Sequence, residues 1–234
     1  MRLRQWEELP AFMQCDEIKE YYDILAGKTV ELRLKRLFDV LLSGILLLFL
    51  AVPMIIIAVL IKRDSKGPVF FRQERITSYG RRFRIHKFRT MVNHADKIGS
   101  AVTVDKDTRI TKVGSKLRDL RLDELPQLID VLFGNMSFVG TRPEAVKYVK
   151  QYTKEMNATL LLPAGITSEA SIRYKDEAAL LNRAEDVDKV YVETILPEKM
   201  TYNLRSIKAF SLCGDAMTML RTVFAVVGRN NAKK

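Results

Sequence analysis

A long apolar run with charged ends constrains this chain more than any other feature. It covers residues 37–61, is flanked by basic pairs at 35–36 and 62–63, and contains Pro53. At about 1.5 Å per residue, a straight helix of this length could cross the roughly 30 Å hydrocarbon core of a bilayer. The run lies too far from Met1, and is too long, for a cleaved signal peptide. It therefore predicts a membrane segment that remains in the mature protein.

Two arrangements of this segment are open. Excess Lys and Arg usually mark one side of a spanning helix, but here both flanks are basic. Pro53 lacks an N–H and clashes with the carbonyl four residues back, so it kinks or breaks a helix. Pieces at 37–52 and 54–61, about 24 Å and 12 Å long, would each be too short to span the core. We favour a segment that enters the cytoplasmic leaflet, bends at Pro53 and returns; a straight spanning helix with a tolerated kink is the alternative.

Size and charge narrow the classes of partner. The 234 residues leave room for one catalytic domain beside the anchor. A net charge of +11 and a pI near 9.6 favour acidic partners: anionic lipid headgroups, nucleic acid or phosphorylated small molecules. The membrane segment favours lipid, since each surface-near Lys or Arg adds roughly 1 kcal/mol of attraction. Cys15 and Cys213 match no metal or redox spacing and suit a reducing compartment.

The sequence predicts an α+β fold: an α-rich cytosolic catalytic domain with a small β-hairpin, anchored by a proline-broken re-entrant membrane helix. We divide the chain into an N-terminal cytosolic extension (1–34), the membrane helix (35–63) and the cytosolic domain (64–234). Apolar periodicity and turn residues predict the following elements. They are an amphipathic helix at 10–25 ending near Gly27, strands at 69–71 and 83–85 around a turn at 77–80, and helices at 115–133, 144–158 and much of 177–225.

The sharpest local signal for chemistry is the segment 122–127, LDELPQ. Asp123 occupies the position of a helix N-cap, Glu124 lies in the first turn, and Pro126 is tolerated there. A helix N-terminus stabilises negative charge, so it would keep a carboxylate ionised and favour a phosphate beside it. Two adjacent acids could provide a divalent-metal ligand and a nucleophile or base. The alternative is a well-capped amphipathic helix with no catalytic part.

Basic residues near this segment favour the catalytic interpretation. Arginine forks match phosphate oxygens bidentately, although acids beside arginines often form only mutual salt bridges. His86 and His94 have no nearby carboxylate cluster, and we do not expect them to be metal ligands. The candidate phosphate-binding residues are Lys87, Arg89, Arg118 and Arg142.

Several short motifs follow one another in order along residues 35–223. They are KRLFD at 35–39, GPVFFRQ at 67–73, KFRTM at 87–91, LDELPQ at 122–127, NMSFVG at 135–140, GIT at 165–167 and ILPEK at 195–199. Each is weak alone. Together they make the chain resemble the bacterial sugar transferases, the monotopic polyprenyl-phosphate phosphoglycosyl transferases that start exopolysaccharide, capsule and glycoprotein glycan assembly.

The resemblance implies an activity and a site. It implies an enzyme on the cytoplasmic face of the bacterial cell membrane that transfers a phosphosugar from a UDP-sugar to undecaprenyl phosphate, with Mg²⁺, releasing UMP. It implies Asp123 as the nucleophile that forms a covalent phosphosugar intermediate, Glu124 as its acidic partner and Mg²⁺ at this pair. Arg118 and Arg142 match family arginines that face substrate phosphates, and Pro53 matches the break in the family's re-entrant helix.

The chain departs from the family pattern at two positions. Val52 precedes Pro53 where many members have Ser, so a side-chain oxygen that could satisfy a freed carbonyl is missing. Thr141 precedes Arg142 where many members have Pro, which changes the stiffness of the loop but keeps its arginine.

The alternative function is a non-catalytic membrane-anchored module whose basic face binds anionic lipid or nucleic acid. Nucleic acid is not expected as a partner, because the chain lacks interleaved exposed aromatics and any recognisable binding motif. The sugar and the glycan pathway stay open, with 168–181 as the region that we associate with specificity. The oligomeric state is also open, including a homo-oligomer.

Overall fold

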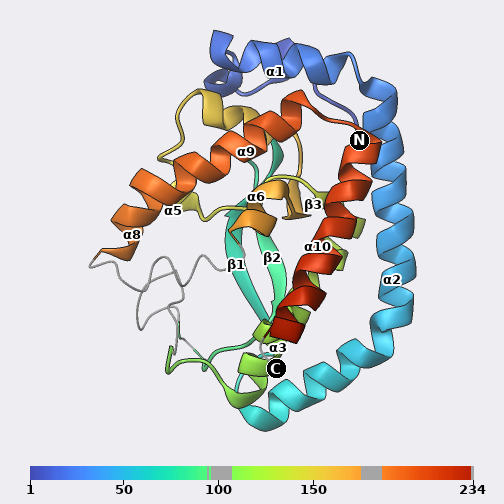
Figure 1. Ribbon diagram of the computed structural model, residues 1–234, viewed down its shortest axis with the longest axis vertical. Coiled ribbons are helices and arrows are strands. Elements are labelled where there is room, and N and C mark those ends of the chain that lie inside the picture. The colour runs from blue at the N-terminus through green and yellow to red at the C-terminus, as the bar shows by residue number, and fades with distance from the viewer. Residues whose placement is uncertain (94, 96–106, 175–185, 233–234) are drawn as a thin grey trace.

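The computed structural model describes residues 1–93, 95, 107–174 and 186–232, and most of this part is helical (Figure 1). The longer helices are α1 Asp16–Ala26, α2 Thr29–Asp64, α3 Lys112–Asp119, α4 Gln127–Leu132, α9 Leu196–Lys208 and α10 Leu212–Ala232. Short helices are α5 Val146–Val149, α6 Glu169–Arg173 and α8 Val187–Val190. The strands are β1 Phe70–Ile76, β2 Arg82–Phe88, β3 Met136–Val139 and β4 Ala164–Thr167. The predicted α-rich architecture with a small β element is confirmed.

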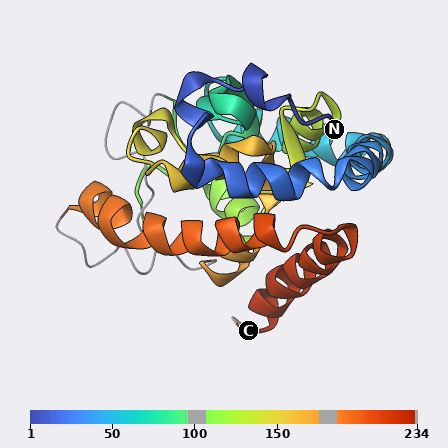
Figure 2. The same ribbon diagram turned by 90° about the horizontal axis from the view of Figure 1, so that it is seen from above.

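The long helix α2 lies along one edge of the molecule, and α1 leads into it (Figures 1 and 2). Among the described helices, it alone is long and apolar enough to cross a membrane. It begins at Thr29 rather than at 35, and it continues through Pro53 as one helix. Its ribbon changes direction in the second half, the part that contains the proline. The helix is therefore bent rather than divided into the two pieces that the sequence predicts.

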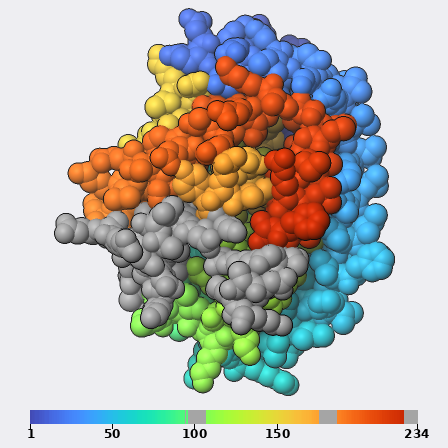
Figure 3. Space-filling view, in the orientation of Figure 1, coloured from blue at the N-terminus to red at the C-terminus, as the bar shows by residue number. Residues whose placement is uncertain are grey.

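One face of α2 packs on the rest of the molecule. Before the proline, Leu42 and Leu46 contact a core cluster that includes Leu128. After the proline, Ile57 and Ile61 are buried in a second cluster. The opposite face exposes large apolar side chains and forms the right-hand edge of the space-filling view (Figure 3). They are Leu37, Phe38, Leu41, Ile45, Leu48, Phe49, Val52, Ile55, Ile56, Val59 and Leu60.

The predicted β-hairpin is present, with longer strands than the sequence indicates. β1 and β2 pair antiparallel from Phe70 opposite Phe88 to Ile76 opposite Arg82. Alternation along β2 places Phe83 and Ile85 in the core beside α4. The hairpin thus presents one face to the helix that follows the LDELPQ segment.

A second pair, β3 and β4, is parallel and was not expected from the sequence. Each strand has only four residues, and a long connection separates the two. No tight turn between them could therefore indicate the pairing from the sequence. The pair depends on a close approach of two glycines. A Cβ on Gly165 would lie 2.2 Å from backbone atoms of Gly140.

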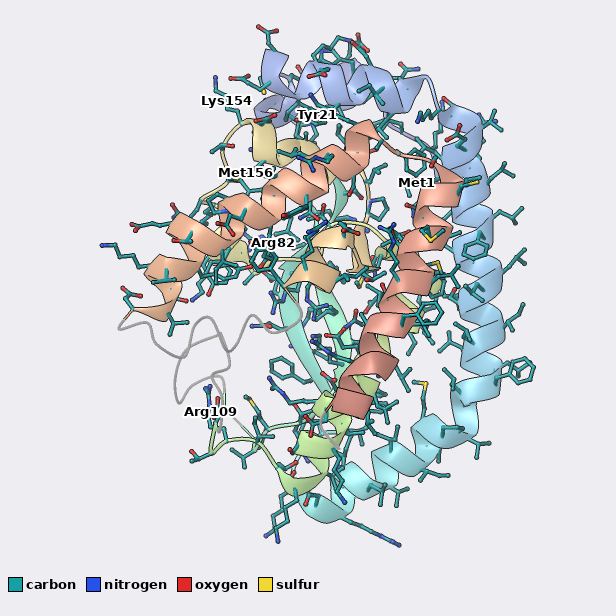
Figure 4. All side chains as sticks on the ribbon, in the orientation of Figure 1. Met1, Tyr21, Arg82, Arg109, Lys154 and Met156 are labelled. Atoms are coloured by element: carbon teal, nitrogen blue, oxygen red, sulfur yellow. The ribbon has the colours of Figure 1, made fainter. Side chains whose placement is uncertain are left out.

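The N-terminal residues pack into the main core. Ile18, Tyr21 and Leu25 of α1 are fully buried in a cluster with Leu161. Tyr21, on α1, lies close to the segment that carries Lys154 and Met156 (Figure 4). Its hydroxyl donates to Glu155 at 2.5 Å. The predicted helix at 10–25 starts later, at Asp16, and Gly27 ends it as expected.

Two predicted helices are interrupted. The one at 115–133 divides after α3, because Arg121 adopts a left-handed conformation (φ 57°) and a 3-10 turn, Leu122–Glu124, follows. The one at 144–158 divides after α5, where the Thr153 hydroxyl accepts from the Met156 N–H and starts a new 3-10 segment. In the region 177–225, the helices from α8 to α10 are found as predicted, while 175–185 lie outside the described residues.

Candidate active site

The acid pair lies in the 3-10 turn Leu122–Glu124, one turn before α4. Asp123 is therefore not the N-cap of α4, which is Pro126. The left-handed Arg121 directs the chain into this turn, and such backbone costs roughly 1 kcal/mol or more for a non-glycine residue. The turn replaces the single capped helix that the sequence predicts.

Two cations hold the Glu124 carboxylate. Lys87 Nζ donates to Oε1 at 2.9 Å, and Arg142 donates through both guanidinium nitrogens, to Oε2 at 3.3 Å and to Oε1. The side chain of Glu124 is 12% exposed, and those of Lys87 and Arg142 are 21% and 31% exposed. The arrangement is a partly buried clamp that joins a strand, a turn and a loop.

Local structure explains why these cations reach Glu124. Lys87 shares the core-facing side of β2 with Ile85, because side chains alternate along a strand. Arg142 follows β3, where the Gly140 N–H donates to Thr167 O and the Gly165 N–H donates to Thr141 O. The loop that carries the arginine is thus fixed at its base.

The two acids have opposite pKa shifts. Burial raises the pKa of Asp123, and the charge of Glu124 raises it further, against the lowering effect of Lys87, Arg118 and Arg121. Burial would also raise the pKa of Glu124, but Arg142 and Lys87 outweigh it and hold that pKa well below its ordinary range. Glu124 is thus the fixed anion, and Asp123 is the acid whose charge depends on its surroundings. This direction is opposite to the lowering of the Asp123 pKa that a helix N-terminus would produce.

The other predicted residues are placed differently. Arg118 lies on α3 near enough to Asp123 to lower its pKa. Arg89 is buried, and its guanidinium donates to the backbone oxygens of Ser65 and Lys66, at the end of α2. Arg89 therefore caps the C-terminal end of α2, and none of these contacts places it beside the acid pair.

The ring Nδ1 of His86 lies 2.9 Å from the Asp130 carboxylate. The backbone N–H of His86 donates to the same carboxylate. His94 lies outside the described residues, as does 175–181 of the predicted specificity region.

A cleft of about 150 Å³ opens beside the clamp. Its lining includes Lys87 and Arg142 together with residues that the sequence analysis missed: Arg75, Gln127, Glu144, Tyr191 and Lys199. Lys199 and Tyr191 both donate to Glu144 Oε1, at 3.4 and 2.6 Å. The available signals were the presence of Gln127 in the LDELPQ motif, of Lys199 in the ILPEK motif and of Glu144 just after Arg142.

Two residues of the KRLFD motif bind the first half of α2 to β3 and α10. Lys35 Nζ contacts Asp215 at 2.5 Å and donates to Val139 O at 2.9 Å. Asp39 accepts from the Phe138 N–H at 3.2 Å. At the other end of α2, Asp64 accepts from the Val113 N–H at 2.9 Å. Both ends of the helix are therefore bound to the same domain.

The acid pair offers few ligands for Mg²⁺. No group of three or more His, Cys, Asp or Glu side chains gathers within the described residues. Mg²⁺ is often held by one or two carboxylates together with waters and substrate phosphates. Glu124 is already engaged by Lys87 and Arg142, whereas none of the hydrogen bonds found within the described chain ends on the Asp123 carboxylate. The residues fit a magnesium ion held through Asp123 and substrate better than one held by both acids.

The chain belongs to the bacterial sugar transferase family, whose model matches residues 30–229. It is 34% identical over 197 residues to a UDP-N-acetylgalactosamine-undecaprenyl-phosphate N-acetylgalactosaminephosphotransferase of Aeromonas hydrophila (83% of this chain, 44% of the relative). It is 36% identical over 196 residues to a UDP-glucose:undecaprenyl-phosphate glucose-1-phosphate transferase of Klebsiella pneumoniae (81% and 39%).

A UDP-glucose:undecaprenyl-phosphate glucose-1-phosphate transferase of Caulobacter vibrioides is 34% identical over 206 residues, which cover 87% of this chain and 73% of the relative. The chain spans less than half the length of the Aeromonas and Klebsiella relatives. The family match at residues 30–229 includes Lys87, Asp123, Glu124 and Arg142.

Proposed function

We propose that this protein transfers a phosphosugar from a UDP-sugar to undecaprenyl phosphate, giving undecaprenyl-diphospho-sugar and UMP. This would be the first membrane step of exopolysaccharide, capsule or glycoprotein glycan assembly. The observation that carries the proposal is an acid pair whose Glu124 contacts Lys87 and Arg142, two of the cationic residues that line the cleft. Arg75 and Lys199 are the other two. The names of the aligned relatives support the choice of substrates.

In the proposed reaction, the Asp123 carboxylate attacks the sugar-bearing phosphorus of the donor. An oxygen–phosphorus bond forms to Asp123, the bond to the bridging oxygen breaks, and UMP leaves with the electron pair. An oxygen of undecaprenyl phosphate then attacks the same phosphorus and releases the carboxylate. This covalent step lets a soluble donor and a lipid acceptor use one site in turn.

The surrounding charges suit such a transfer. The diphosphate would repel an incoming carboxylate, and fixed cations offset that repulsion. Glu124 holds Lys87 and Arg142 in place, and Arg118 lies on the side of Asp123. Mg²⁺ held through Asp123 would neutralise further charge on the diphosphate. Chelation with EDTA should abolish UMP release, and added Mg²⁺ should restore it; activity that survives chelation would exclude the metal requirement.

We also propose that α2 is a re-entrant anchor at the cytoplasmic face of the cell membrane. Lys35 and Asp64, near its two ends, both contact the domain that carries the site, which favours both ends lying on one side of the bilayer. The exposed apolar face would then enter the lipid. Single cysteines at the exposed positions Asp16 and Ser115, in a background without Cys15 and Cys213, should both react with an impermeant maleimide from the same side of oriented vesicles. Labelling from opposite sides would establish a spanning helix.

The decisive experiment is UMP release from a panel of UDP-sugars by purified protein in lipid, with and without undecaprenyl phosphate. Release that depends on the lipid, with one sugar preferred, is the expected result and would identify the donor. No turnover with any donor, together with binding of the protein to anionic vesicles, would favour the non-catalytic module instead. Intact-protein mass spectrometry after mixing with donor alone should detect a phosphosugar on Asp123.

A further inference from the structure

One polar side chain in the cleft has no partner. Gln127, the last residue of the LDELPQ motif and the first of α4, is 1% exposed and lines the cleft. Its Nε2 is buried and makes no hydrogen bond within the described chain. Leaving a buried donor unpaired is unfavourable, so native structures rarely keep one without a reason. The amide thus has a donor available at the wall of the cleft.

The charged groups around the amide are mostly hydrogen-bond donors. The neighbouring lining residues Arg75, Lys87, Arg142 and Lys199 carry only donors on their charged groups. Glu144, the carboxylate in the lining, is already engaged by Tyr191. A group that satisfies Gln127 must therefore bring acceptors and tolerate several cations. Phosphoryl oxygens have both properties, whereas sugar hydroxyls would bring donors of their own to face the cations.

We propose that Gln127 is a positioning residue for the donor: its Nε2 donates to a phosphoryl oxygen of the UDP-sugar diphosphate. This inference rests on the proposed function. Gln127 lies four residues after Asp123, and it lines the cleft together with Lys87 and Arg142, the two cations that hold Glu124. The bond holds the sugar-bearing phosphorus in register with the carboxylate.

The test uses Gln127→Met, which keeps the length of the side chain and removes the donor. Gln127→Glu provides a second variant that keeps the shape but replaces the donor with an acceptor. Gln151→Met is the matched control, because Gln151 is exposed and follows α5 in the sequence. All are measured as full-length protein in lipid nanodiscs.

Stability and kinetics should move in different directions. Because Nε2 is unpaired in the free protein, Gln127→Met should leave the Tm unchanged or raise it. The same variant should lower kcat/KM for the UDP-sugar by roughly 10- to 100-fold, the effect of losing a hydrogen bond to a charged group. KM for undecaprenyl phosphate should stay unchanged, and the rise in Tm that UDP produces should shrink. Gln127→Glu should lose at least as much donor kcat/KM, and Gln151→Met should match the wild type.

Three results would overturn the inference. A Gln127→Met variant with wild-type donor kinetics would exclude the bond. A lowered Tm with unchanged donor kcat/KM would assign Gln127 to the fold, and an effect confined to the lipid KM would assign the amide to the acceptor phosphate. If the wild type releases no UMP, the proposed function fails, and the response of Tm to UDP in the wild type and Gln127→Met still decides whether the amide contacts a diphosphate.

Discussion

Arg36 donates to the carbonyl oxygen of Leu132 at 2.8 Å and to that of Val131 at 2.6 Å. These carbonyls belong to the last turn of α4, the helix that begins just after Asp123 and Glu124. A cation at a helix C-terminus satisfies carbonyls that have no partner within the helix. The short helix α4 therefore connects α2 directly to the acid pair.

Replacing Arg36 should affect a site that it does not touch. We expect Arg36→Gln to lower the free energy of unfolding by about 1–3 kcal/mol, because it leaves buried carbonyls unpaired. Because α4 loses its attachment, UMP release should also fall while vesicle binding persists. Arg33→Gln, an exposed arginine on the same helix, should change neither. Equal behaviour of the two variants in thermal unfolding would contradict this account.

Asp123→Asn should remove the nucleophile and little else. We expect UMP release to fall by more than about 1,000-fold, since an amide cannot form the covalent intermediate. Flotation with liposomes should be unchanged, because α2 supplies the apolar surface. Asp16→Asn, an exposed carboxylate on α1, serves as the control. Near-normal turnover by Asp123→Asn would assign the nucleophile elsewhere.

The ion pair between Lys35 and Asp215 should show strong coupling. Lys35→Met leaves Asp215 in a mostly buried position without its cation, and we expect a loss of about 3 kcal/mol. Asp215→Leu alone should also destabilise. The double variant should lose clearly less than the two single losses combined, because it removes both charges. Additive losses in a chemical-denaturation cycle would mean that the pair contributes no mutual stabilisation.

The stability provided by Glu144 should depend on pH. Burial would raise its pKa, but Lys199, Tyr191 and Arg75 outweigh it and hold the pKa below the ordinary value of 4.5. A carboxyl whose pKa is lower in the folded state stabilises the fold above the unfolded pKa, and the effect disappears as the pH falls through the folded value. At neutral pH, the free energy of unfolding of the wild type should therefore exceed that of Glu144→Gln by about 3 kcal/mol. The difference should shrink below about pH 4.5; a difference independent of pH would refute the assignment.

Two glycines offer a matched pair of alanine substitutions. Gly165→Ala would force its Cβ against the backbone of Gly140, so β3 and β4 must separate. We expect a loss of about 1–3 kcal/mol or more and reduced activity, since Arg142 follows this strand pair. A Cβ on Gly44, in α2, meets nothing within 4 Å. Gly44→Ala should gain about 0.5–1 kcal/mol, and thermal unfolding of both variants would check the contrast.

The sequence predicts the parts of this structure that depend on local patterns. The apolar run predicts α2, alternation predicts the hairpin, and the motifs predict that Glu124 and Arg142 belong to one site. Local patterns cannot predict contacts between distant segments. Tyr191 and Lys199 reach Glu144 from 47 and 55 residues away, and nothing in their own neighbourhoods indicates it. The 3-10 turn at Asp123 was missed because the left-handed Arg121 carries no sequence signal, unlike a glycine.

The contact between Lys35 and Asp215 joins residues 180 positions apart. During synthesis, the apolar helix leaves the ribosome long before the residue that secures its first turns. The helix is therefore shielded or already in lipid before Asp215 has been made. The contact between α2 and α10 then forms late in folding. A chain truncated before α10 would reach the membrane without the ion pair that joins α2 to the rest of the domain.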